Sequence, residues 1–477
     1  MEAVAPAEVL RSQRYRGSAH VDPAHRRQPP NRRAFAGRDF DAASPRTDRG
    51  RRIGGGATAL SATGVRIGEE VMGPFARLHQ LIAIGLLSAI ALADAGGAEP
   101  VVELVTIGPD HEIDGRFGHS LLRVVDAESG MDDVYDFGVA DFQRPDFIAE
   151  VAMGRARFRL QRSSAQTRFE NYALRDRRID AQRLNLTGDQ IAHLIERLEW
   201  NLLPENAEYA YDDVGDNCST RLRNLLNDAT GGAVQLAAYA MPIQRTYRED
   251  ILDAGSGRLL GPIAYDLLTG PRAENRVGAW QLSFLPQRLR GVLAVAENPA
   301  FGEGAMLVAS ERVLHRREAA PAVEGSVRVA RRWIMASGAV LGLFFGFTGF
   351  TVWRTRRSVK WLARLAGLVL IQTSALFGSL GLALLPIALL SNAAIWTDNQ
   401  NAWLFFPLDL LLLGPGFRWL WTGRATLATW SRAYIDLRFL MVMAGWTGVA
   451  YPQENSAFAL AVALTLVGLR TQPLKRG

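Results

Sequence analysis

The sequence predicts an α+β domain followed by an all-α transmembrane bundle. Three observations lead to this prediction. Short apolar runs separated by Gly- and Asp-rich turns occupy residues 101–141, as in a β-sheet. Apolar stripes with helical spacing follow, and uncharged runs of about 20 residues, long enough to cross a bilayer, begin only after residue 333.

The changes in composition divide the chain of 477 residues into five parts. We predict a leader at 1–71, a signal peptide at 72–95, a soluble domain at 96–314, a charged linker at 315–333 and the membrane region at 334–477. The leader contains 13 Arg and no Lys against 8 Asp and Glu, a balance of +5 out of the net charge of +6. Because this excess is confined to a disordered or mistranslated extension without interleaved aromatic residues, we expect no nucleic-acid partner.

The signal peptide is predicted from the stretch that begins at Met72. A short segment with Arg77 precedes the apolar run Leu81–Ala93, and the small residues Ala93 and Ala95 form a cleavage site. A signal peptide works near a true N-terminus, so we expect translation to begin at Met72. The alternative is a first transmembrane helix, but 13 apolar residues are few for a bilayer.

The soluble domain should begin with three strands and continue with two helices. The runs 101–108, 119–126 and 132–141 predict the strands. A capping box of Thr187 and Gln190 predicts the start of one helix. The other helix should follow Cys218 and stop at the glycine pair 231–232.

The membrane region contains two strong spans, a third that Asp409 interrupts, and two weaker ones; they are Ile334–Trp353, Leu365–Leu390, Ala402–Trp421, Ala433–Ala450 and Ala457–Leu469. Basic and non-basic segments between them alternate, as the positive-inside rule requires, which places the soluble domain outside the cytoplasm. We therefore expect a multi-pass membrane protein with its soluble domain outside the cytoplasm. Asp409 and Asp436 are functional candidates because charges within spans are rare, although Asp436 could lie at the cytoplasmic edge beside Arg438.

Cys218 is the only cysteine of the chain, which is unusual for an exported domain, where structural cysteines come in pairs. Its place at a helix start should favour the reactive thiolate. A nucleophilic cysteine needs a base, and His119 is a better candidate than His111 or His193, which read as solvent-exposed residues. Asp136 on the next predicted strand could orient His119, but the strand register is not determined by the sequence.

Other kinds of site have weaker support in the sequence. No His or Cys cluster has metal-ligand spacing, no phosphate-binding loop follows a strand, and no G-x-S-x-G elbow is present. We therefore expect neither a metal nor a cofactor.

Three segments together resemble the periplasmic domain of Lnb-type bacterial lipoprotein N-acyltransferases. They are "FGHSLLRV", "VYDFG" and "YAYDDVGDNCSTRLRNLL". The later segments "RTYREDILDAGSGRLLGPIAYDLL" and "SFLPQRL" extend the resemblance over roughly residues 100–295. It implies a permuted papain-like fold, similar to that of the lecithin–retinol acyltransferase group, in which the histidine precedes the cysteine.

By this resemblance Cys218 is the nucleophile and His119 the base. Further residues of the same motifs would bind substrate or support the site: Ser120, Tyr135, Asn217, Ser219 and Thr220.

The implied reaction moves a fatty acyl chain from a phospholipid, through a thioester, to the N-terminal amine of a diacylglyceryl lipoprotein. Phospholipid, lipoprotein and membrane are thus the expected partners. One alternative is a cysteine amidase or peptidase that acts on cell-wall peptide. Another is a membrane scaffold in which Cys218 is buried and inert.

Overall fold

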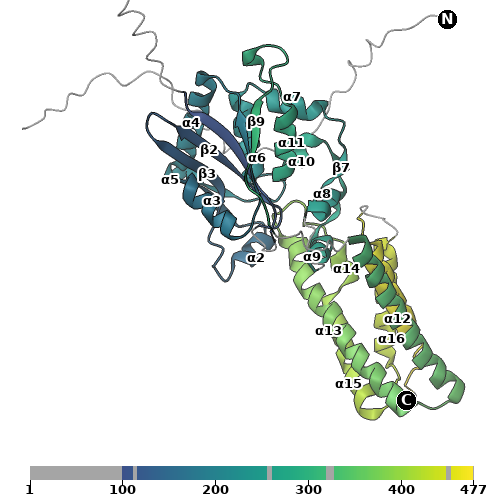
Figure 1. Cartoon of the computed structure of the whole chain (residues 1–477). Coiled ribbons are helices and arrows are strands. Elements are labelled where there is room, and N and C mark those ends of the chain that lie inside the picture. Colours follow the sequence, from purple (N-terminus) through teal and green to yellow (C-terminus); the bar gives the residue numbers. More distant parts are fainter. Residues whose placement is uncertain (1–98, 111–114, 255–259, 319–326, 447–452, 476–477) are drawn as a thin grey trace, which may run out of the picture. The chain divides into compact units, whose positions relative to one another are not determined.

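The computed structural model describes residues 99–110, 115–254, 260–318, 327–446 and 453–475 (Figure 1). All of them belong to one compact unit, Ala83–Gly477. The predicted leader, the start at Met72, the signal peptide and His111 lie outside the described residues.

A seven-stranded antiparallel sheet in the order β6-β4-β3-β2-β1-β5-β9 forms the centre of the first domain. The three predicted strands are confirmed and become β1, β2 and β3. The strands are β1 Val101–Ile107, β2 His119–Asp126, β3 Met131–Val139, β4 Arg157–Ser164, β5 Ile179–Leu184, β6 Glu208–Ala210 and β9 Val308–His315. Because strand side chains alternate between faces, each face of the sheet carries its own core.

The larger core lies on the face that carries Leu104, Leu122 and Tyr135. Helix α4 (Gly188–Leu202) covers it with the stripe of Ile191, Leu194 and Leu198, and α6 (Cys218–Ala229) and α11 (Pro286–Val295) pack into the same cluster. The opposite face, with Val105 and Leu121, is covered by α3 (Ala165–Leu174). The sheet is therefore sandwiched between helices.

The two predicted helix starts are confirmed by their capping hydrogen bonds. Thr187 Oγ1 accepts from the backbone N of Gln190 at 3.3 Å, and Gln190 Oε1 accepts from the backbone N of Thr187 at 3.0 Å. This reciprocal pair satisfies N–H groups that a helix start leaves unpaired.

Shorter elements complete the domain: α2 Phe147–Ala152, α5 Pro204–Ala207, α7 Ala233–Ala240, α8 Tyr247–Ala254, α9 Leu260–Leu268, α10 Ala279–Leu282, η3 Pro271–Glu274, η4 Pro299–Phe301, and the two-stranded sheet of β7 Arg245–Thr246 and β8 Arg276–Val277.

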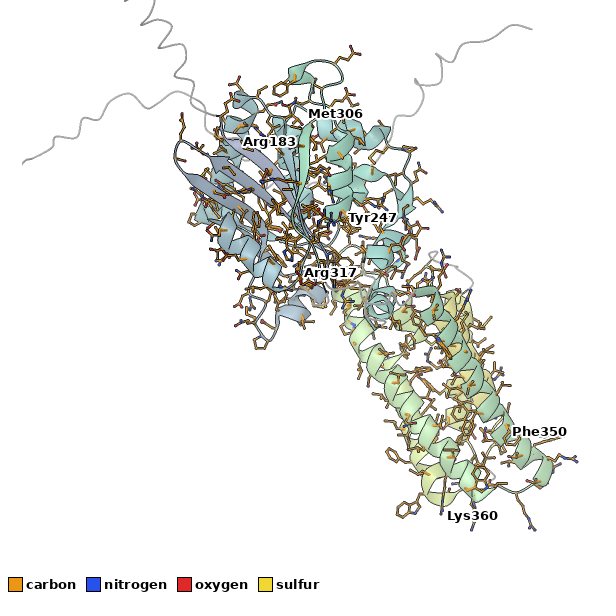
Figure 2. The ribbon with its side chains drawn as sticks, viewed as in Figure 1. Arg183, Tyr247, Met306, Arg317, Phe350 and Lys360 are labelled. Atoms are coloured by element: carbon orange, nitrogen blue, oxygen red, sulfur yellow. The ribbon has the colours of Figure 1, made fainter. Side chains whose placement is uncertain are left out.

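A helical region follows the sheet-rich domain, as predicted. Among the described residues two helices, α12 (Val327–Thr355) and α13 (Lys360–Leu390), are long and apolar enough to cross a membrane. The basic turn between them lies at one end of this region, where Figure 2 shows Phe350 and Lys360. The remaining elements are α14 Asn401–Leu404, η5 Pro407–Leu412, α15 Leu413–Thr422, α16 Thr429–Trp446 and α17 Ser456–Arg470.

The segment Ala402–Trp421, predicted as a third span that Asp409 interrupts, is divided into α14, η5 and α15, and Asp409 lies in η5. Pro407 has no N–H to continue a helix. Arg438 is fully buried and donates to the carbonyls of Trp403 and Leu404 at 2.9 and 2.7 Å. It also pairs with Asp409 at 2.8 Å. A charged side chain thus satisfies backbone groups that the broken helix leaves without partners.

Candidate active site

His119 and Asp136 meet at the point where β2 and β3 separate. The Nε2 atom of His119 lies 2.7 Å from Asp136 Oδ1. The ladder between the two strands ends at the pair Leu122 and Tyr135, and β3 is irregular after Asp136. Both side chains leave the same face of the sheet, so the separation opens room beside them for another element.

Two glycines make this geometry possible. Gly118 has a φ of +81°, which favours glycine, and a Cβ there would lie 2.6 Å from the carbonyl oxygen of Ile107. A Cβ on Gly138 would overlap the imidazole ring of His119. Gly118 therefore lets the chain pass close to β1 just before His119, and Gly138 leaves room on β3 for the imidazole ring.

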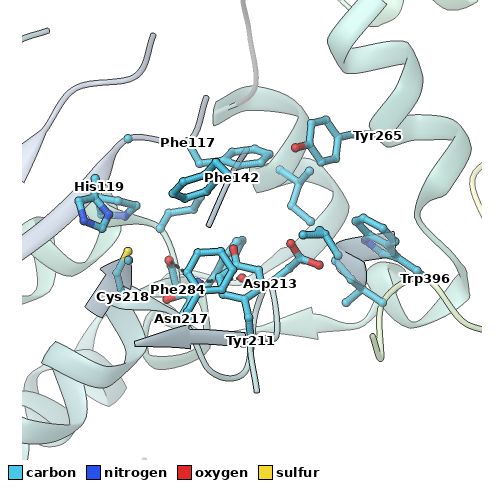
Figure 3. A pocket seen from close by; sticks show the side chains of 18 of the residues that line it. Phe117, His119, Phe142, Tyr211, Asp213, Asn217, Cys218, Tyr265, Phe284 and Trp396 are labelled. Atoms are coloured by element: carbon cyan, nitrogen blue, oxygen red, sulfur yellow. Dashed lines mark hydrogen bonds between the residues drawn. The ribbon is translucent and has the colours of Figure 1, made fainter. Parts of the chain in front are cut away.

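Cys218 is the first residue of α6, whose N-terminus lies against the start of β2 (Figure 3). Asn217 caps the helix: its Oδ1 accepts from the backbone N of Ser219 and of Thr220, both at 3.0 Å. Its Nδ2 donates to the carbonyls of Asp213 at 2.8 Å and Phe284 at 3.1 Å. Asn217 therefore joins the helix start to two other segments of the site.

The capping also determines which backbone N–H groups are free to stabilise the oxyanion that forms when a thiolate attacks a carbonyl. Asn217 occupies the N–H groups of Ser219 and Thr220. Within the described residues the N–H of Cys218 has no acceptor, which leaves it as the donor available at the helix start.

The electrostatics favour a thiolate paired with an imidazolium. Burial would lower the pKa of His119, but the charges of Asp136 and Cys218 outweigh it and hold that pKa well above its ordinary value. Burial would raise the pKa of Cys218, but the charge and hydrogen bond of His119, with the backbone N–H of Ser120, bring it below the usual value. The pKa of Asp136 is lowered: His119 and Arg168 outweigh its burial. The imidazolium of His119 thus stabilises the carboxylate of Asp136 on one side and the thiolate of Cys218 on the other.

Arg168 and Tyr172 of α3 belong to the same cluster and were missed in the sequence. Arg168 lies 2.9 Å from Asp136 Oδ2, and the ring of Tyr172 lies 6.5 Å from that of His119. Asp136 therefore bridges the histidine to a second cation. Nothing in the sequence of α3 marks Arg168 as a partner of Asp136.

The remaining predicted residues divide into two groups. Ser120 and Ser219 are buried and their hydroxyls lie 2.9 Å apart, which ties β2 to α6 beneath the thiol. Tyr135 points to the opposite face of the sheet, where its hydroxyl donates to Glu199, so it does not reach the thiol.

His193, which we expected on the surface, and the two functional candidates Asp409 and Asp436 form ion pairs of their own. His193 pairs with Asp228 on the surface at 2.9 Å. Asp436 pairs with Arg470 at 2.7 Å, and Arg438 binds Asp409 instead.

A cavity of about 570 Å³ opens beside Cys218 and His119 (Figure 3). Most of its lining is apolar and aromatic, including Phe117 and Phe284. Two lining residues, Ile395 and Trp396, come from the segment that follows α13. A cavity of this size and character suits a lipid chain better than a polar substrate.

In the part of the chain that the structure describes, no three His, Cys, Asp or Glu side chains gather closely enough to hold a metal ion. The chemistry that this arrangement supports directly is attack by a thiolate on a carbonyl in an apolar surrounding.

Comparison with protein families gives one match. Residues 97–250 match the model of the Lnb N-terminal periplasmic domain. The match includes His119, Asp136 and Cys218 and confirms the resemblance seen in the sequence. Comparison with curated proteins and with solved structures gives no match.

Proposed function

We propose a specific enzymatic activity for this protein. The proposal starts from the match of residues 97–250 to the Lnb periplasmic domain and from the two long apolar helices. The protein is a cysteine acyltransferase of the bacterial inner membrane, multi-pass, with its catalytic domain in the periplasm. The acyl chain passes from a phospholipid to the N-terminal amine of a diacylglyceryl lipoprotein. The observation that carries the proposal is a thiol with a lowered pKa that opens onto a large apolar cavity.

The first half-reaction forms a thioester. The thiolate of Cys218 attacks the ester carbonyl of the phospholipid, and the N–H of Cys218 stabilises the oxyanion. The ester C–O bond breaks, and the imidazolium of His119 gives its proton to the departing lysophospholipid oxygen. The acyl chain stays in the cavity, bonded to sulfur, and His119 is neutral.

The second half-reaction transfers the chain to nitrogen. The amine of the lipoprotein attacks the thioester carbonyl, and the C–S bond breaks. His119 takes the proton that nitrogen loses, which restores the imidazolium and the thiolate. Asp136 orients the ring through its hydrogen bond in both halves. Because both substrates are held in the bilayer, a membrane anchor raises their effective concentration at the site.

The test is the intact mass of the detergent-purified full-length protein after incubation with a defined phospholipid. We expect a gain of one acyl chain that hydroxylamine removes and that is absent from Cys218→Ala. His119→Ala should lose the adduct, while the matched variant His193→Ala should keep it, because His193 lies on the surface with Asp228.

Two results would contradict the proposal in different ways. Ready alkylation of Cys218 without any acyl adduct favours the amidase, which uses the same residues on a peptide. Neither adduct nor alkylation favours an inert thiol in a scaffold.

A further inference from the structure

The cavity contains one carboxylate that the proposed mechanism does not use. Asp213 lines the cavity, and apart from the thiol the only other lining side chain that can be charged near neutral pH is His119, which Asp136 already binds. Figure 3 shows the Asp213 carboxylate among apolar side chains, in this view between Cys218 and Trp396.

Asp213 is held in this position by the site itself. Asn217, the capping residue beside the nucleophile, donates to the carbonyl of Asp213 at 2.8 Å. The loop is closed by the bridge between Asp212 and Asp216, and Asp212 Oδ1 accepts from the N–H groups of Val214 and Gly215. The Asp212 carboxylate thus stabilises the loop, whereas the Asp213 carboxylate projects into the cavity.

No other described residue donates a hydrogen bond to the Asp213 carboxylate or forms an ion pair with it. Arg116, which neighbours the lining residue Tyr265, lies 6.0 Å from the centroid of that ring. Burial, and then the charge of Asp212, raise the pKa of Asp213 to about 7. A carboxylate in an apolar cavity without a partner is costly, and a cationic ligand removes that cost.

We propose that Asp213 binds the primary ammonium group of a lipid substrate in this cavity. The assignment rests on the proposed function, because both of its substrates can carry such a group: the α-amine of the acceptor, and the ethanolamine headgroup of a phospholipid donor. In either case the ammonium donates to the carboxylate while the lipid chain occupies the apolar lining. An acceptor bound in this way gives one ammonium proton to Asp213 before its nitrogen attacks the thioester, and His119 then takes the second proton.

Binding alone tests the assignment without any reaction. Isothermal titration calorimetry of the full-length protein in detergent compares hexylammonium with hexanol. We expect the protein to prefer hexylammonium by about ten-fold or more, as for a charge-assisted hydrogen bond, and Asp213→Asn to remove the preference. Asp213→Glu should keep part of it. Asp228→Asn, which removes the same charge at an exposed position, should keep all of it. No preference in the wild type, or an unchanged one in Asp213→Asn, overturns the assignment.

Single-turnover experiments then identify the source of the ammonium. If it is the acceptor amine, Asp213→Asn slows transfer from the preformed thioester to a diacylglyceryl lipopeptide by about ten-fold or more and leaves acylation unchanged. If it is the headgroup, the variant slows acylation by phosphatidylethanolamine but not by phosphatidylglycerol. Equal slowing of both acylations and of transfer means a disturbed cavity and overturns the assignment. Absence of the thioester in the wild type overturns the proposed function alone, because the calorimetry still decides the role of Asp213.

Discussion

The Nε2 atom of His119 lies 2.7 Å from Oδ1 of Asp136, although the two residues are on strands whose pairing ends before either is reached. The contact is therefore made by side chains across an opening in the sheet. It leaves the other ring nitrogen of His119 to face Cys218, whose pKa the imidazole lowers. The protonation of the ring and the reactivity of the thiol should thus change together.

Replacing Asp136 by Asn should narrow the pH range of acylation. Acylation needs the imidazolium as proton donor, so the rate falls as pH rises through the pKa of His119. Asp136 raises that pKa, and its loss should move the alkaline limb to lower pH. We also expect a maximal rate lower by about 10²- to 10⁴-fold. The measurement is the single-turnover acylation rate against pH; an alkaline limb at its wild-type position would contradict the role of Asp136.

Removing the imidazole should make Cys218 a weaker nucleophile. In His119→Ala burial is no longer opposed by a nearby positive charge, so the pKa of the thiol should rise above its usual range. Because the thiolate is the reactive form, the midpoint of alkylation by iodoacetamide should move to higher pH. His193→Ala is the control, and an alkylation profile shared by all three proteins would refute the coupling.

A methyl group on Gly138 should disable the site without unfolding the domain. The added Cβ overlaps the ring of His119, which must turn away from Asp136. We expect loss of thioester formation with only a small change in thermal unfolding. Gly291→Ala on α11 is the matched control, because its Cβ meets nothing, and it should stabilise the fold by about 0.5–1 kcal/mol. Equal activity of the two variants would show that the ring tolerates displacement.

The buried pair of Arg438 and Asp409 should matter more for stability than any surface pair of the helical region. Asp409→Asn leaves Arg438 charged and fully buried, which typically costs about 3–5 kcal/mol. Asp436→Asn breaks a partly exposed pair with Arg470 and should cost less than about 1 kcal/mol. Thermal unfolding in detergent compares the two. Similar melting temperatures would mean that the backbone of the broken segment has other partners.

Local signals made most of the fold predictable. The first three strands are short apolar runs bounded by Gly- and Asp-rich turns. The caps at Thr187 and Asn217 depend on residues three positions apart. Asp136 could be proposed for the site but not placed, because its contact with His119 depends on where β2 and β3 separate. The permuted papain-like fold remains a prediction of the resemblance.

The parts that escaped prediction depend on contacts between distant segments. Arg168 of helix α3 reaches Asp136 of strand β3, and the cavity wall at Trp396 comes from the segment beyond α13. For the segment Ala402–Trp421 the sequence indicated an interruption at Asp409, but hydropathy counts side chains along one segment only. It cannot show that Arg438 from a later helix supplies hydrogen bonds to a broken backbone.

The contribution of Ile395 and Trp396 to the cavity has a consequence for biogenesis. A ribosome makes Cys218 well before these residues, since both long apolar helices intervene. In the proposed enzyme, a newly made domain therefore carries its nucleophile in an unfinished cavity until the segment beyond α13 is in place. A proteolytic fragment that ends before α12 would keep the thiol but lack this wall. In an enzyme of the proposed kind, acyl transfer would thus require the segment that follows α13 as well as the nucleophile.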